Sequence, residues 1–126
     1  SEGLDPDEAM RRIVNFVHEN RTSKKNDRPV FVAHNAPFDW MFFAYTCGHA
    51  GLTNPFGWSA IDTKALAMGK LNLSWPQTSL KNVRETLGNV EEMDPDQLHH
   101  AGADARHLAY VFSSLMHHPK VEPSIR

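Results

Sequence analysis

Four apolar residues that favour β-structure open the stretch around which we expect the rest of this chain to be organised. Residues 30–33 predict a buried strand, and the polar residues after them predict a turn. From Phe38 to Ala50 the apolar positions recur with helical spacing, and Gly51 supplies a stop. The pattern therefore predicts a strand, a turn and a helix in direct succession.

A helix is also predicted before this stretch, over residues 6–20. Asp5 is its expected cap, Pro6 its first residue, and Glu8 stands at the spacing of a capping box. The residues expected on its buried side are Met10, Ile13, Val14 and Val17.

Shorter elements follow in the second half. We predict a strand over residues 59–62 and then a helix over 63–69, which Thr63 caps. A loop is expected over residues 71–77, in which Trp75 and Pro76 pack as a lid. A further helix is predicted over residues 80–87, and Gly88 ends it. A long amphipathic helix begins near His100. The predicted class is α/β with helices dominating. Two strands alone are too few for a stable sheet that covers so many helices.

Apolar spacing predicts which sides of the two longest later helices are buried. The first set is Phe38, Met41, Phe42 and Tyr45, and the second is Leu108, Phe112, Leu115 and Met116. We expect the first set to form core rather than a surface on which bases stack.

Composition narrows the class of protein. The chain has 126 residues, 40% of them hydrophobic and 22% charged, which suits a single globular domain over residues 1–126. Its net charge of −2 argues against a strongly basic nucleic-acid coat and leaves a local basic patch open. The single cysteine, Cys47, excludes an internal disulfide and is expected in the core. We expect a cytoplasmic protein without a membrane partner, because no signal peptide or membrane span is apparent.

Two aspartates stand in the first turns of separate predicted helices and follow histidines. Asp39 has two equally weighted interpretations: it complements the helix dipole, with Asn35 as cap, or it belongs to a site at the end of a core strand. Carboxylates that converge from different elements, such as Asp39 and Asp104, suit a hard cation such as Mg²⁺. Asp62 also follows a strand, but a capping or structural role is favoured for it.

The histidines offer a general base and a rival site. A histidine near the carboxylates is suited to proton transfer near neutral pH. A zinc site built from His34, His99 and His100 is the rival, although no HExxH motif or cysteine cluster supports it. The remaining histidines are expected on the surface: His18, His49, His107, His117 and His118.

The order of these motifs resembles that of a known family. His34-Asn35-x-x-Phe38-Asp39 resembles the second motif of the DEDDh 3′–5′ exonucleases, which have a ribonuclease H-like fold. His99-x-Ala101-x-x-Asp104 resembles the third. Either motif alone is weak, but both in order, with a strand and a helix between them, form a strong signal over residues 8–118.

The resemblance implies a hydrolase that uses two Mg²⁺ or Mn²⁺ ions on the 3′ end of single-stranded DNA or RNA. Asp39 and Asp104 would each hold a metal ion, and His99 would act as general base on the attacking water. Two cations about 4 Å apart stabilise the attacking and the leaving oxygen. Substrate contacts are expected from His34, Asn35 and Phe38, with Asn35 also holding the turn.

One part of the family pattern is missing. The first motif, an aspartate and a glutamate two positions apart on the first strand, has no counterpart, since the acidic residues at 5–8 start a helix. The chain therefore resembles the C-terminal portion of the exonuclease domain without its N-terminal strands. We expect an incomplete metal site, weak activity, and association with a second copy or with the missing segment. The alternative is a non-catalytic module that binds nucleic acid or a protein partner.

Overall fold

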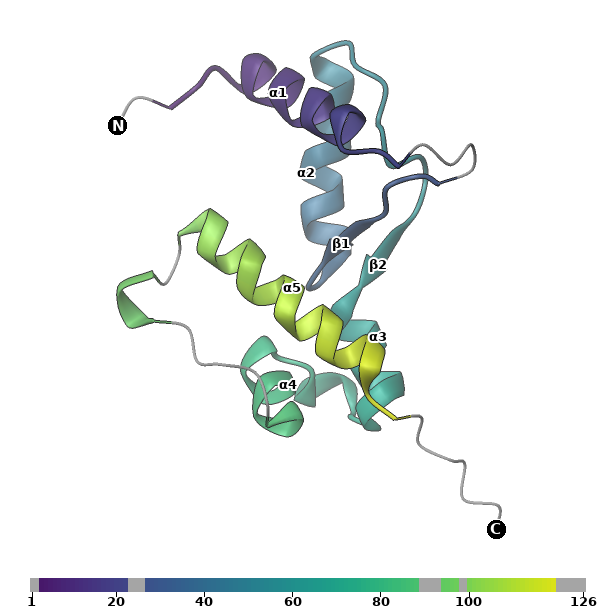
Figure 1. Cartoon of the computed structure of the whole chain (residues 1–126), viewed down its shortest axis with the longest axis vertical. Coiled ribbons are helices and arrows are strands. Elements are labelled where there is room, and N and C mark those ends of the chain that lie inside the picture. The colour runs from purple at the N-terminus through teal and green to yellow at the C-terminus, as the bar shows by residue number, and fades with distance from the viewer. Residues whose placement is uncertain (1–2, 23–26, 89–93, 98–99, 120–126) are drawn as a thin grey trace. The chain divides into compact units, whose positions relative to one another are not determined.

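The computed structural model describes residues 3–22, 27–88, 94–97 and 100–119 (Figure 1). The chain divides into two compact units, Ser1–Ile61 and Asp62–Arg126. The described residues form two strands and five α-helices, which confirms the predicted α/β class. This content is compatible with a piece of a ribonuclease H-like domain. None of the described helices is both long and apolar enough to cross a membrane.

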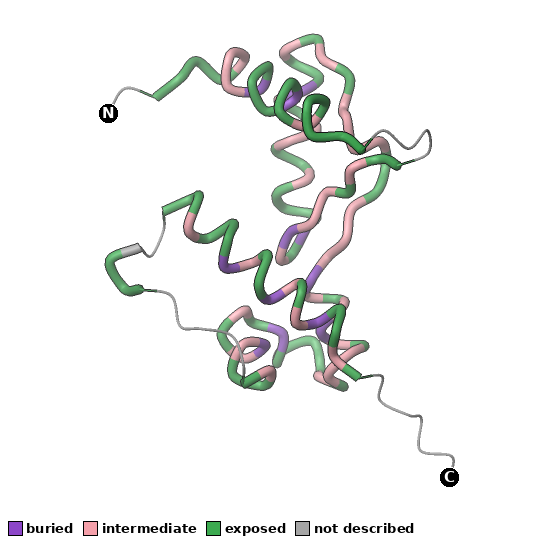
Figure 2. The backbone as a smooth tube through the Cα atoms, in the orientation of Figure 1, coloured by how far each residue is buried: buried purple, intermediate pink, exposed green. Residues whose placement is uncertain are grey.

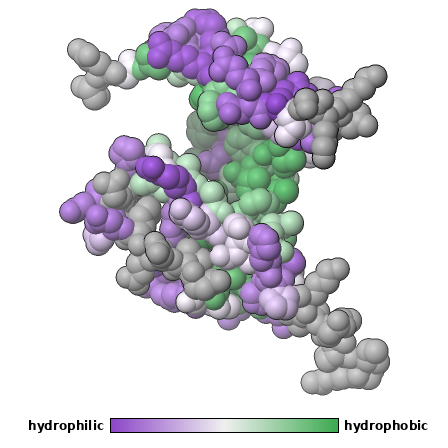
Figure 3. Space-filling view, in the orientation of Figure 1, coloured by the Kyte–Doolittle hydropathy of each residue, from purple (hydrophilic) through white to green (hydrophobic). Residues whose placement is uncertain are grey.

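The first unit is built on two helices and a strand, in the order α1 (Pro6–Glu19), β1 (Phe31–Ala33) and α2 (Ala36–His49). Strand β2 (Ala60–Asp62) pairs with β1. Helix α1 packs against α2, and the contact buries Met10, Val14 and Cys47. Figure 3 shows that the visible side of α1, at the top of the view, is mostly hydrophilic.

Aromatic rings pack where β1 meets α2 and the segment that follows it. The ring of Phe31 lies 5.4 Å from Trp40, 5.5 Å from Phe43 and 5.3 Å from Phe56, measured between centroids. Such tilted and edge-on pairs add to the free energy gained from burying apolar area. They fix α2 against the strand that precedes it.

The start of α1 follows the sequence prediction in all but one detail. Asp5 caps the helix by accepting from the backbone N–H groups of Asp7 and Glu8, at 3.0 and 3.4 Å. Glu8 does not complete a capping box. Its carboxylate instead accepts from Nε of Arg12 at 2.8 Å and Nε of Arg11 at 3.4 Å. These guanidinium groups hold the pKa of Glu8 below its ordinary value.

The second unit is helical. Its elements are α3 (Thr63–Leu71), the 3₁₀ turn η1 (Trp75–Gln77), α4 (Leu80–Leu87), the 3₁₀ turn η2 (Pro95–Gln97) and α5 (Ala101–His117). Helix α5 packs against both α3 and α4. The buried core consists of Ala67, Val83, Val111 and Leu115. Gly88 ends α4 in the left-handed conformation, with φ of 68°, as predicted.

The buried face predicted for α2 is wrong, and the face predicted for α5 is right only in part. On α2 the side chains of Phe38, Met41, Phe42 and Tyr45 are all exposed, by 55–73%. On α5, Leu115 is buried as predicted, but Met116 is exposed. The other buried residues of this helix are His107 and Val111, while Leu108 and Phe112 are half-buried. Figure 2 shows that buried and exposed stretches alternate along α5. On α1, Ile13 is also exposed, while Met10 and Val14 are buried as expected.

Candidate functional site

Asn35 forms the tight junction between β1 and α2. It stands at the N-cap position in the left-handed conformation, with φ of 61° and ψ of 51°. Asparagine tolerates this region better than most residues other than glycine. Its side chain makes no capping hydrogen bond, so the interpretation of Asn35 as a side-chain cap is wrong. The turn lets the helix begin within three residues of the strand end, which places Asp39 in its first turn.

Asp39 is exposed at this junction. Its carboxylate makes no hydrogen bond or ion pair with any other residue that the structure describes. The neighbouring Phe38 is 59% exposed and meets Phe42 edge-on at 5.1 Å, while its backbone N–H donates to the carbonyl of Asn35 at 3.0 Å. His34 is half-buried just before the turn. The junction therefore presents an accessible carboxylate beside an accessible aromatic ring.

Asp104 has the same relation to α5. It lies in the first turn, is exposed, and its backbone N–H donates to the carbonyl of His100 at 2.9 Å. Its carboxylate also has no hydrogen-bonding or charged partner within the described ranges. His100 stands at the N-cap, and its ring lies close to Gly102, where a methyl group would be 3.6 Å from Cε1. His99, the predicted base, lies outside the described residues.

The donors of these two junctions fit a hard divalent cation. Both are carboxylates, both reach solvent, and neither is occupied by a partner among the described residues. In the part of the chain that the structure describes, no group of three or more His, Cys, Asp or Glu side chains is placed to hold a metal. Asp39 belongs to the first unit and Asp104 to the second, so their convergence stays a prediction.

Asp62 caps the helix that follows it. It is the N-cap of α3 and accepts from the backbone N–H of Lys64 at 2.9 Å. Thr63, which we expected to be the cap, is instead the first helical residue and is fully buried. The favoured interpretation of Asp62 is therefore the one that the structure shows.

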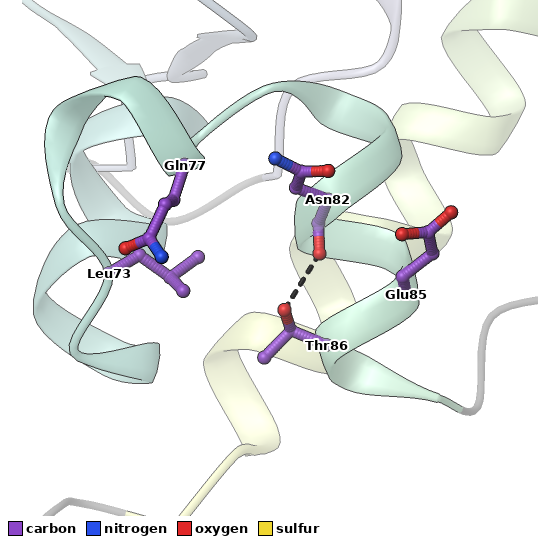
Figure 4. A pocket seen from close by; sticks show the side chains of 5 residues that line it. All are labelled: Leu73, Gln77, Asn82, Glu85 and Thr86. Carbon is purple, nitrogen blue, oxygen red and sulfur yellow. Dashed lines mark hydrogen bonds between the residues drawn. The ribbon is translucent and has the colours of Figure 1, made fainter.

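Two features of the second unit were missed from the sequence. His107, assigned to the surface, is buried with its Nε2 atom unpartnered within the described chain. A pocket of about 300 Å³ also opens beside η1, in the region expected to be a loop (Figure 4). Its signal was present in the sequence, because Ser74 and Gln77 have the spacing of a capping box.

Comparison with known proteins finds relatives that are named as nucleases. None of the family models searched matches it. It is 36% identical over 112 residues to the 3′–5′ DNA exonuclease Cap18 of Escherichia coli, an alignment that covers 88% of the chain and 56% of that protein. It is 32% identical over 126 residues to ribonuclease T of Escherichia coli (strain K12) and of Shigella flexneri, covering 90% of the chain and 56% of each relative. The chain thus spans about half the length of the curated relatives it matches.

Proposed function

Because this chain belongs to the DEDDh family of 3′–5′ exonucleases, we propose that it hydrolyses phosphodiester bonds at the 3′ end of single-stranded DNA or RNA with divalent metal ions. One observation carries the proposal. Each of the two family motifs delivers an accessible aspartate with no partner among the described residues, in the first turn of a helix. A purely structural aspartate at a helix start would more often be used as Asp5 and Asp62 are, to cap backbone N–H groups.

The proposed metal ligands are Asp39 and Asp104, each toward Mg²⁺ or Mn²⁺. When bound, two such ions stabilise the negative charge on the attacking and leaving oxygens of the phosphodiester. The acidic pair of the family's first motif has no counterpart in the sequence, so the full site requires these carboxylates from another segment or chain.

The remaining roles concern water and substrate. His99 takes the proton of the attacking water, a task suited to a side chain that titrates near neutral pH. Phe38 offers an exposed ring on which a terminal base can stack. Asn35 holds the turn that places Phe38 and Asp39 together, and His34 contacts the substrate from the strand end.

The experiment supplies the missing carboxylates. The chain is fused to the first-motif region of another member of the family, and 5′-labelled single-stranded DNA and RNA are incubated with the fusion in Mg²⁺, Mn²⁺ or Zn²⁺. We expect stepwise shortening from the 3′ end with Mg²⁺ or Mn²⁺. Asp39→Asn and Asp104→Asn should each remove it.

Asp7→Asn is the control, because Asp7 is also a first-turn aspartate and the variant removes the same kind of charge beside a helix N-terminus, although the carboxylate of Asp7 also lies 3.3 Å from Nδ1 of His49. Its activity should equal that of the parent fusion. Shortening that survives Asp39→Asn would overturn the proposal, as would zinc-dependent cleavage alone. A folded fusion that binds the strands with and without metal, yet never cleaves them, would favour the non-catalytic alternative.

A further inference from the structure

A pocket in the second unit is lined mainly by polar side chains. It is lined by Leu73, Gln77, Asn82, Glu85 and Thr86, and its volume is about 300 Å³. Figure 4 shows Leu73 and Gln77 on one side, from the segment around η1, and Asn82 and Thr86 on the other, from α4. All these residues belong to one unit, so the pocket does not depend on how the two units are arranged.

The side chain of Gln77 is held in one orientation. Its Oε1 atom accepts from the backbone N–H of Ser74 at 2.9 Å and from the hydroxyl of Ser74 at 2.8 Å. A backbone N–H can only donate, so the atom facing it must be the amide oxygen. The NH₂ group of Gln77 therefore faces away from Ser74, with both protons unused within the described chain.

Asn82 faces Gln77 with its whole amide available. Its backbone is used, since the N–H donates to Ser79 at 3.2 Å and the carbonyl accepts from the hydroxyl of Thr86 at 2.7 Å. Its side-chain amide has no partner among the described residues. That Thr86 bond occupies the only hydroxyl proton, so the threonine oxygen can only accept from a ligand.

Charge excludes a phosphate as the occupant. None of the five described lining residues is basic, and Glu85 brings a carboxylate that is only loosely paired with Lys81 at 3.9 Å. The pocket offers the fixed NH₂ donor of Gln77 and the side-chain amide of Asn82, which can both donate and accept. Glu85 and Thr86 add acceptor oxygens, and Leu73 adds an apolar side chain. A flat neutral group with alternating donors and acceptors on its edge fits this set, and paired side-chain amides are well suited to base edges.

We propose that this pocket binds a nucleobase, with Gln77 and Asn82 reading its hydrogen-bonding edge. The inference rests on the proposed function, because a single-stranded substrate is what would bring unpaired bases to this surface. The contact is distinct from the stacking assigned to Phe38, which belongs to the first unit.

The test uses nucleosides, which carry no phosphate, and needs neither metal nor cleavage. Adenosine, cytidine and uridine are titrated into the ¹⁵N-labelled chain, with ribose as the sugar control and a dinucleotide to represent a base within a strand. Backbone resonances of Leu73, Gln77 and Asn82 should shift with at least one nucleoside and stay unchanged with ribose. A dinucleotide that binds more tightly than its nucleosides indicates a base held within a strand, and equal binding indicates that the pocket contacts the base alone; both support the pocket.

The variant Gln77→Glu keeps the oxygen that Ser74 binds and replaces the donor with an acceptor. Combined with Asn82→Asp, it should weaken nucleoside binding about tenfold, the scale of one or two lost hydrogen bonds. Asn15→Asp on α1 makes the same amide-to-carboxylate change away from the pocket and should have no effect.

Each contrary result counts against the pocket. Equal shifts with ribose, shifts confined to other residues, or a double variant that binds like the parent would overturn the proposal. Because the titrations measure binding without hydrolysis, an absence of nucleoside binding would leave the exonuclease proposal intact. Conversely, nucleoside binding in a fusion that cannot cleave would separate the pocket from catalysis.

Discussion

The thiol of Cys47 lies 3.4 Å from the carbonyl oxygen of Leu52 and donates its proton into the turn that follows α2. The same turn is closed in the opposite direction, because the N–H of Leu52 donates to the carbonyl of Cys47 at 3.0 Å. Cys47 is buried against Met10 and Val14, and this burial raises the pKa of its thiol above the ordinary value of 9.0. The residue thus links the end of α2 to the core of the first unit.

We predict that Cys47 reacts with a thiol reagent at pH 8 at least about tenfold more slowly in the native chain than in urea, because only opened molecules expose a thiolate. The rate is followed with a chromogenic disulfide. Equal rates in both conditions would contradict the burial of the thiol.

The raised pKa of Cys47 also gives a pH dependence. Above pH 9.0 the unfolded chain loses the thiol proton while the folded chain keeps it, so the free energy of unfolding should fall as pH rises through that range. Urea titrations at several pH values measure this, and Cys47→Ala should remove that part of the slope.

Two adjacent residues of α5 differ in burial and can be compared by substitution. Leu115 is fully buried, whereas Met116 is 51% exposed. Leu115→Ala should lower the free energy of unfolding by about 2–5 kcal/mol through lost burial and the remaining cavity. Met116→Ala should change it by less than about 0.5 kcal/mol. Urea unfolding followed by circular dichroism compares them, and similar losses would contradict the exposure of Met116.

We expect His107 to lower the free energy of unfolding of the chain. Its Nε2 atom is buried without a partner in the described chain, and such a group loses its hydrogen bonds to water on folding. His107→Leu should raise the free energy of unfolding at pH 8 by about 1–2 kcal/mol. His117→Leu, at an exposed position, is the control and should not stabilise. A destabilised His107→Leu variant would mean that the imidazole has a role in the core.

The two adjacent histidines before α5 should differ in activity. In the active fusion described above, His99→Ala should lower turnover by roughly a hundredfold or more, while metal binding measured by calorimetry stays nearly unchanged. His100, which stands at the N-cap with its ring close to Gly102, should tolerate the same change. Loss of turnover in His100→Ala with near-normal turnover in His99→Ala would reverse the assignment.

Local chemistry in the sequence determined where most elements begin and end. Asp5 and Pro6 start α1, Asn35 precedes α2, and Gly88 ends α4, because capping and left-handed backbone depend on residues next to one another in the chain. The two first-turn aspartates were found in the same way, from the junctions that contain them.

Tertiary packing alone decided which helix faces are buried. The run from Phe38 to Cys47 is apolar on nearly every side, so its periodicity could not distinguish the face with Phe43 and Cys47, which packs toward α1, from the exposed face with Phe38 and Tyr45. On α5 the packing against α3 and α4 selects Val111 and buries His107, a polar residue that no hydrophobic pattern includes. Whether Asp39 and Asp104 share metal ions depends in the same way on how distant segments meet, which spacing along the chain does not specify.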